Sequence, residues 1–253
     1  MLANWEAKII KLLETQQYNK LIQECEQAIN NNEQGCLPYW YLGLAYLLQQ
    51  QAEEAQAIWL SGWFEAPGEE TSEQRTQQLA TILEREAQRQ AAKEAFSISA
   101  AIREQLQEIQ PENLNNDLQL IKILISNKAF SPDLLEQWEF ISRLEAVQEI
   151  DEELLKEVVG LLLVNFPSTI HTSLVKVAFS KSQDQVDFLR LLVSSAIELA
   201  YNHFKKKSAI AVLELCEQID PKFQLNLKYL ANISCEIGDY QKAIETSQNF
   251  LEN

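Results

Sequence analysis

The residues best suited to catalysis lie far apart in this sequence. The two histidines, His171 and His203, are 32 positions apart on different predicted helices, and no nucleophile or metal-ligand pattern surrounds either. Glu152 and Glu153 are adjacent, and adjacent residues on a helix diverge by about 100°, so the two carboxylates cannot flank one bond. The sequence also lacks a glycine-rich phosphate loop. We therefore expect no enzyme active site, no metal and no cofactor.

The four cysteines point to neither a zinc site nor a disulfide framework. Cys25, Cys36, Cys216 and Cys235 form no C-x-x-C pair and have no close histidine. Free thiols are typical of a reducing compartment, so we expect a cytoplasmic protein. The first fifteen residues include charged positions where a signal peptide needs an unbroken apolar run. Even the run 158–164 is far shorter than a membrane span.

The chain is strongly acidic, with 21 Lys and Arg against 37 Asp and Glu and a net charge of −16. Such a surface repels phosphate backbones and anionic lipid, so we expect neither nucleic acid nor a membrane as partner. One basic run, Lys205-Lys206-Lys207, could be argued as a nucleic-acid contact. Because it falls at a predicted helix end, we interpret it instead as a favourable partner of the helix dipole.

Helix-forming residues dominate the elements that would position these groups. Only 6 Gly and 6 Pro interrupt the sequence, and apolar residues recur every three or four positions. We predict fourteen helices and no strands. The predicted helices in the middle of the chain are 71–93, 95–109, 114–127, 131–145, 151–165 and 168–180. The first can be capped by Thr71 and Gln74, and the helix 151–165 is apolar nearly all round, so it must be covered on several sides.

A period of 34 residues organises both ends of the chain. Small residues at positions 8, 20 and 27 would let helix A and helix B of one repeat approach closely, and proline at position 32 would end helix B. The repeat that starts at Cys36 has the sequence features Leu42, Gly43, Tyr46, Ala55, Gly62 and Pro67 in this register. This spacing resembles the tetratricopeptide repeat. In-phase repeats are 2–35, 36–69, 190–223 and 224–253, and degenerate helical pairs occupy 71–181.

These repeats predict an all-α fold: a right-handed α-solenoid of about seven antiparallel helix pairs, degenerate in the middle. Because no flexible linker interrupts the helices, we expect one domain over 1–253.

Three stretches resemble one group more specifically: YWYLGLAYLLQQQAEEAQAIWL, LEREAQRQAAKEAFSISAAIREQLQEIQPENLNNDLQLIKILI and LKYLANISCEIGDYQKAIETSQNF. They are similar to the amino-terminal region of cyanobacterial SPINDLY-type O-linked N-acetylglucosamine transferases, some relatives of which carry an FkbM-type methyltransferase domain. The resemblance implies a downstream catalytic domain and no catalytic residue here. Animal relatives place an asparagine ladder at position 6, where this chain has Ala7, Tyr41, Ser195 and Tyr229. Ladder-type binding is therefore not expected.

A superhelix of such 34-residue repeats presents positions 2, 5, 6, 9, 12 and 13 of each helix A to a ligand groove. In the second repeat this stripe includes Trp40, Tyr41 and Leu44. It would suit an amphipathic helix or an extended peptide. It could equally pack against the chain's own later helices, and the sequence leaves both interpretations open.

The last two repeats are the better candidate for a binding face, because polar groups and interleaved tyrosines supply hydrogen bonds and rigid contact area together. The candidate residues are Ser195, Glu198, Tyr201, Asn202, Lys228, Tyr229 and Asn232. An ordinary solvated face is the alternative.

The last repeat stops at its position 30, without a closing proline or a polar capping helix. Since solenoids need a terminal cap, we expect that the chain belongs to a longer protein or that a partner covers this end, including a homodimer through the uncapped repeat. We predict a non-catalytic scaffold that binds proteins or peptides, the partner-recognition region of a larger glycosyltransferase-like protein. A free-standing adaptor or assembly factor is the alternative.

Overall fold

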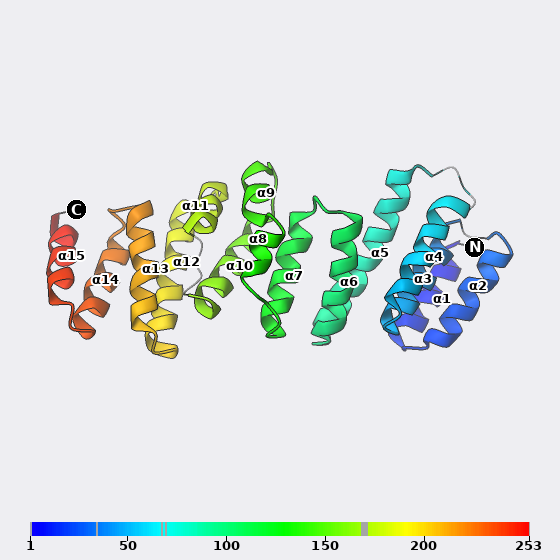
Figure 1. The fold of residues 1–253 in the computed structure, drawn as a ribbon, viewed down its shortest axis with the longest axis horizontal. Helices are drawn as coiled ribbons and strands as arrows, with labels where there is room; N and C mark the ends of the chain where they lie inside the picture. The colour runs from blue at the N-terminus through cyan, green and yellow to red at the C-terminus, as the bar shows by residue number, and fades with distance from the viewer. Residues whose placement is uncertain (1, 34, 67, 69, 168–171, 253) are drawn as a thin grey trace. The chain divides into compact units, whose positions relative to one another are not determined.

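The computed structural model describes residues 2–33, 35–66, 68, 70–167 and 172–252, and the statements below concern these residues. They form fifteen α-helices and one π-helix, with no strand among them (Figure 1). The predicted all-α repeat fold is confirmed. Contacts divide the chain into two compact units, Met1–Pro111 and Glu112–Asn253, which we describe separately. The single-domain organisation stays a prediction.

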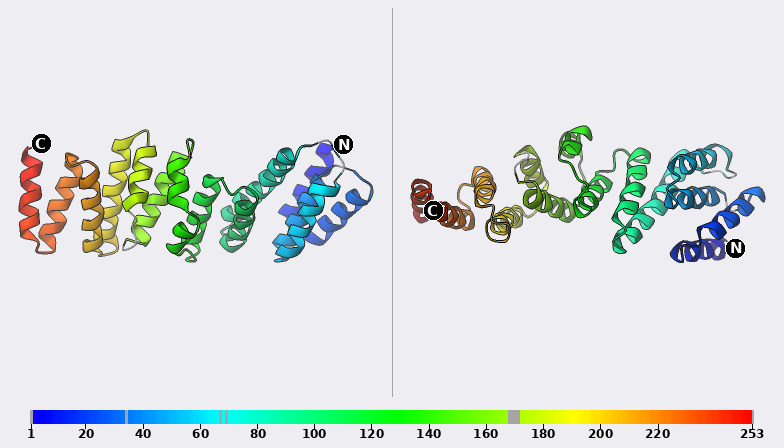
Figure 2. Two further views of the ribbon diagram at one scale, coloured as in Figure 1. Left: turned by 45° about the horizontal axis from the view of Figure 1, so that its top comes forward. Right: turned by 60° about the horizontal axis from the view of Figure 1, so that its bottom comes forward.

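Three helix pairs make up the first unit (Figures 1 and 2). They are α1 (Leu2–Glu14) with α2 (Tyr18–Asn30), α3 (Leu37–Leu48) with α4 (Ala52–Glu65), and α5 (Ser72–Ala92) with α6 (Phe96–Ile109). Helix α3 also contacts α2 and α5, so it is covered on three sides. The predicted cap of α5 is present: Gln74 N donates to Thr71 Oγ1 over 3.2 Å, and Thr71 N donates to Gln74 Oε1 over 2.9 Å.

The small residues of the second repeat pack as predicted. A Cβ atom placed on Gly43 would lie 2.3 Å from Trp59 Nε1, and one on Gly62 would lie 2.7 Å from the Trp40 ring. Ala55 is fully buried on the same face. Close approach of α3 and α4 therefore depends on these positions lacking bulk. Pro67 lies outside the described residues.

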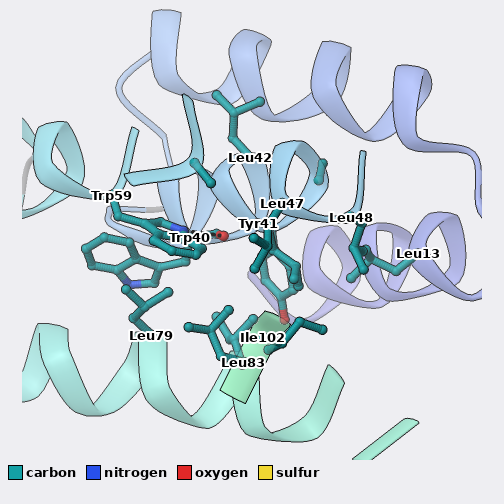
Figure 3. Packing of buried hydrophobic residues seen from close by; sticks show 14 of the residues in the cluster. Leu13, Trp40, Tyr41, Leu42, Leu47, Leu48, Trp59, Leu79, Leu83 and Ile102 are labelled. Carbon is teal, nitrogen blue, oxygen red and sulfur yellow. Dashed lines mark hydrogen bonds between the residues drawn. The ribbon is translucent and has the colours of Figure 1, made fainter. Parts of the chain in front are cut away.

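Aromatic side chains fill the space between these helices. The rings of Trp40 and Trp63 pack at a tilt of 57° with centroids 5.2 Å apart, and Trp59 Nε1 donates a hydrogen bond of 3.2 Å to the Trp40 carbonyl. In Figure 3, Leu79 and Leu83 of α5 lie against Trp40 and Tyr41. With Trp5 added, four of the five tryptophans belong to this unit.

A buried arginine closes the end of α4. Arg75 donates from Nη1 to the carbonyls of Trp63 at 2.6 Å and Gly62 at 3.3 Å, and from Nη2 to that of Ala66 at 3.1 Å. The last carbonyls of a helix have no partner within the helix. The guanidinium supplies partners from α5 and so joins the second helix pair to the third.

In the second unit, four helices form one row: α7 (Leu114–Ser126), α10 (Glu152–Asn165), α12 (Gln185–Ile197) and α14 (Gln224–Glu236). The remaining helices are α8 (Asp133–Gln137), α9 (Phe140–Ala146), α11 (Thr172–Lys181), α13 (Lys206–Ile219) and α15 (Tyr240–Glu252), and the π-helix η1 (Glu198–Asn202) continues α12. Helix α10 contacts α7, α11 and α12, which confirms that its apolar surface is covered on several sides.

The single helix predicted over 131–145 is wrong. The chain breaks into α8 and α9 at Glu139, whose φ of 49° is left-handed. The break lets Arg143 donate to the Trp138 carbonyl at 3.3 Å and pair with the buried carboxylate of Asp117 at 2.8 Å. A continuous helix would not place that guanidinium over both acceptors. The first residues of the predicted helix 168–180 lie outside the described residues.

A left-handed residue marks the turn between helices A and B in all four predicted repeats. Position 15 is Gln16, Gln50, Phe204 and Gly238, with φ between 55° and 85°. Glu94 and Lys128 have the same conformation after α5 and α7, and they are themselves 34 residues apart. One further 34-residue interval therefore occurs where the sequence pattern decays, out of register with the repeats at both ends.

Candidate functional site

The aromatic stripe of the second repeat lies in the core of the first unit. Trp40, Tyr41 and Leu44 are fully buried by the surrounding helices. The Tyr41 hydroxyl donates to Glu6 Oε1 over 2.7 Å and accepts from Arg85 Nη2 over 2.5 Å. Packing against the chain's own later helices, one of the two interpretations above, therefore describes these three residues. Helices α1, α2, α4 and α5 all contact α3 or its side chains, so a partner could reach these three residues only by displacing part of this packing.

The second unit contains an open recess of about 580 Å³ between α10, α12 and α14. All three belong to the row of helices described above, and α12 and α14 are the A helices of the last two predicted repeats. The lining residues are Glu153, Lys156, Glu157, Asp187, Arg190, Leu191, Val193, Ser194, Ile197, Leu225 and Tyr229. We call this recess the groove.

One wall of the groove is a network of ion pairs. Lys156 Nζ lies 2.5 Å from Glu153 and 2.9 Å from Asp187, which joins α10 to α12. Hydrogen bonds to these two carboxylates raise the Lys156 pKa above its ordinary value. Glu157 is held by Lys122 of α7 at 2.7 Å. These ion pairs therefore link α7, α10 and α12 along the wall.

Arg190 lies in the same groove but is not part of that network. Its guanidinium is exposed and makes no ion pair or side-chain hydrogen bond with the described residues. Beside it, Leu191 and Ile197 are partly exposed and Leu225 is exposed, while Tyr229 contributes an aromatic ring. The groove thus combines an unpaired cation, an apolar surface and a rigid aromatic side chain.

The structure brings some of the predicted binding residues together. Tyr229 lines the groove, and Lys228 Nζ lies 5.8 Å from its ring centroid. The Tyr201 pKa is raised chiefly by burial, then by Glu236, and least by the nearby Tyr229. Ser195 is instead buried, near Gly160 of α10. The remaining candidates are exposed on the same helices: Glu198, Asn202 and Asn232. Their role in binding stays a prediction.

Sequence reasoning missed the contribution of α10. Glu153, Lys156 and Glu157 lie in the degenerate middle of the chain, where no repeat register assigns a groove position. Arg190 was missed because it is position 1 of its repeat, which is not a groove position. The only available signal was the i, i+3 pairing of Glu153 with Lys156, and exposed helices commonly show that pattern.

The interpretation of Lys205, Lys206 and Lys207 as favourable dipole partners is wrong. Helix α13 begins at Lys206, with Lys205 at the N-cap, so these cations face the positive end of the helix dipole. The first turn of α13 contains no acidic residue to offset them.

Other chemically capable groups are dispersed. In the part of the chain that the structure describes, no three His, Cys, Asp or Glu residues are grouped to hold a metal ion. Glu152 accepts from Gln183 N at 2.8 Å while Glu153 pairs with Lys156, so the two carboxylates point to different partners. His171 lies outside the described residues. No helix within the described ranges is both long and apolar enough to cross a membrane.

The cysteines differ sharply in accessibility, which gives a first prediction. Cys25, Cys36 and Cys216 are buried, and burial raises all three thiol pKa values, that of Cys216 to about 12. Cys235 on α14 is exposed. With a thiol reagent at pH 8, we expect one rapid reaction per chain at Cys235 and three slow ones, since thiolates react and buried thiols are not ionised. Loss of the rapid phase in Cys235→Ser is the control, and a second rapid thiol would contradict the packing.

Neither a protein-family model nor a curated protein matches the sequence. Solved structures similar to this chain include the MamA protein, with 13% identity over 68% of this chain and 90% of that one and a TM-score of 0.40. The C-terminal part of a TPR repeat-containing protein from Cytophaga hutchinsonii is 13% identical over 97% of this chain and 94% of that one, with a TM-score of 0.38. The TPR domain of P58(IPK) is 14% identical over 100% of this chain and 93% of that one, with a TM-score of 0.31. At these TM-scores the likeness carries no weight, and the repeat fold rests on the helix pairs of this chain.

Proposed function

We propose that this chain is a protein–protein interaction scaffold and that the groove between α10, α12 and α14 receives a segment of its partner. The supporting observation is the unpaired guanidinium of Arg190 beside the apolar residues Leu191, Ile197 and Leu225 and the ring of Tyr229. Arginine and tyrosine are the side chains that most often dominate binding energy at interfaces. A partner segment with one acidic and several apolar side chains fits this composition.

Changing the groove should remove specific partners. In the variant Arg190→Glu with Leu225→Lys, the cation is inverted and the apolar surface acquires a charge, while both positions are exposed and tolerate the change. We expect the amounts of specifically captured proteins, measured by quantitative mass spectrometry on the immobilised chain, to fall at least about tenfold.

The matched control makes the same charge changes at an exposed cation and an exposed leucine away from the groove. Lys176→Glu with Leu60→Lys changes an exposed cation on α11 and an exposed leucine on α4. Capture should be retained in this control. If the groove variant captures the same proteins in the same amounts as the unaltered chain, the groove is not the binding surface.

The sequence resemblance supports a narrower proposal: the scaffold selects acceptor proteins for a glycosyltransferase-like domain of the same cytoplasmic protein. The free thiols favour a reducing compartment. A coding sequence that continues past codon 253 into such a domain would support this role, and one that does not would favour a free-standing adaptor. We also propose a homodimer through the exposed apolar side chains of α15, Ile244 and Leu251, which analytical ultracentrifugation can test.

A further inference from the structure

The turn between α12 and α13 differs from the other A-to-B turns of the repeats. Helix α12 widens into the π-helix Glu198–Asn202 before it ends, and Lys205 N donates to the Leu199 carbonyl over 2.7 Å. The corresponding turns are closed by a narrower hydrogen-bonded loop. In the second repeat, for example, Gln51 N donates to the Tyr46 carbonyl over 3.0 Å. Short π-helical segments that continue an α-helix are found frequently at functional sites. The name 201–207 turn is used below for the end of the π-helix, the loop that follows it and the first two residues of α13.

Phe204 occupies the left-handed position of this turn, with φ 55°. The equivalent residues are Gln16, Gln50 and Gly238, which are flexible or lack a side chain. A left-handed conformation is unfavourable for L-residues, and most of all for bulky ones. The side chain gains no packing in return, because it is 86% exposed. Phenylalanine here is therefore costly for the fold of the free chain.

Other exposed aromatic and apolar side chains lie at the same edge of the unit. The turn between α14 and α15 lies at the same end of the helices as the 201–207 turn (Figure 1 and Figure 2, left). The two turns are joined through Glu236, which accepts from Tyr201 at 3.1 Å and pairs with Lys206 at 2.8 Å. Tyr240, which follows the second turn, is 64% exposed. Phe204, Tyr201 and Tyr240 thus line one edge of the second unit.

The same edge holds two lysines without a carboxylate partner among the described residues, beside the charges of Lys206, Glu198, Glu236 and Asp239. Lys206 is paired with Glu236, but Lys205 and Lys207 are exposed and make no ion pair with the described residues. Both stand at the positive end of the α13 dipole, where cations are unfavourable. The chain as a whole has a net charge of −16. Two unpaired lysines beside an exposed phenylalanine therefore complement a negatively charged, partly apolar ligand.

We propose that the 201–207 turn binds an acidic peptide segment of a partner protein, with an apolar side chain of that segment seated on Phe204 and its carboxylates facing Lys205 and Lys207. An anionic membrane or nucleic acid would meet the repulsion of the remaining acidic surface. A second copy of this chain is also acidic, and the experiment below separates it from a peptide. This surface is distinct from the groove.

The test uses random peptides displayed on phage and selected on the purified chain. We expect enrichment of peptides that combine Asp or Glu with Leu, Ile or Phe. Synthetic versions should bind Phe204→Gly at least about tenfold more weakly in isothermal titration calorimetry, because an aromatic anchor is removed. Glycine also relieves the left-handed strain, so the thermal unfolding midpoint should equal or exceed that of the unaltered chain. Weaker binding then cannot be attributed to misfolding.

Two controls match the two parts of the proposed surface. Phe64→Ala removes a phenylalanine that is 85% exposed on α4, and it should leave peptide affinity unchanged. Lys205→Glu with Lys207→Glu should weaken binding at low salt more than at high salt, since salt screens exposed charges. Lys176→Glu with Lys222→Glu makes the same charge change elsewhere and should have a much smaller effect.

Several results would overturn the proposal. Selected peptides without acidic residues would exclude the acidic segment. So would equal affinity for Phe204→Gly of peptides that still bind the groove variant Arg190→Glu with Leu225→Lys. Phe204-dependent binding to phosphatidylserine vesicles without peptide binding would identify a membrane surface instead. Loss of self-association in Phe204→Gly, measured by sedimentation, would identify a second copy. A lower unfolding midpoint for Phe204→Gly would refute the argument from strain.

Discussion

Replacing Gly43 with alanine should lower the free energy of unfolding by about 2 to 3 kcal/mol. The new Cβ would lie 2.3 Å from Nε1, 2.6 Å from Cδ1 and 2.8 Å from Cε2 of Trp59. The indole cannot yield easily, because it is buried and bonded to the Trp40 carbonyl. Alanine's better helix propensity, worth about 1 kcal/mol, offsets part of this cost. Urea unfolding followed by circular dichroism measures the change.

Gly160→Ala is the matched control, since Gly160 also lies within a helix. There the new Cβ would meet only the flexible end of Leu191 at 3.2 Å and Ser195 Oγ at 3.9 Å. Its stability should stay within about 0.5 kcal/mol of the unaltered chain or rise by up to about 1 kcal/mol. Equal destabilisation by both substitutions would mean that close approach at Gly43 is not what holds α3 against α4.

Arg75→Met should cost about 3 kcal/mol, because it leaves the carbonyls of Gly62, Trp63 and Ala66 without their shared donor in a buried place. Methionine keeps the apolar length of the side chain, so the loss reports the hydrogen bonds together with the longer ionic contact of Arg75 with Glu70 at 3.9 Å. Lysine should recover part of the stability, since its single ammonium group cannot reach all three acceptors. Chemical denaturation of both variants measures this order.

Arg85→Met provides the comparison for a mostly exposed guanidinium, whose partners are Tyr41 and Glu6. Its cost should stay below about 1 kcal/mol, as is usual for exposed pairs. If Arg75→Met costs no more than Arg85→Met, the end of α4 does not depend on its cap from α5.

Small residues at fixed spacing were the most informative part of the sequence. Gly43, Ala55 and Gly62 pack one helix against the next, and this is a local requirement that residue type alone can express. The capping box at Thr71 is equally local. For that reason the helix pairs, and the residues at which many of the helices begin and end, could be predicted.

What covers a helix face could not be predicted in the same way. The stripe around Trp40 and Tyr41 has the composition of a groove, but α5 lies over it, and no local pattern states where the next helix pair docks. The break at Glu139 depends on the distant carboxylate of Asp117, with which Arg143 pairs. The groove likewise needs α10 beside α12, which is a tertiary relation without a repeat signature.

The uneven distribution of tryptophan determines what an optical experiment reports. Trp5, Trp40, Trp59 and Trp63 belong to the first unit, while the second contains Trp138 alone. Intrinsic fluorescence is therefore dominated by residues before 112, whereas the helical far-ultraviolet signal averages over both units. A ligand that binds at the groove or at the 201–207 turn would leave most of the tryptophan emission unchanged. The fluorescence change on binding would therefore be small for the unit where we place the partners, even when binding is tight.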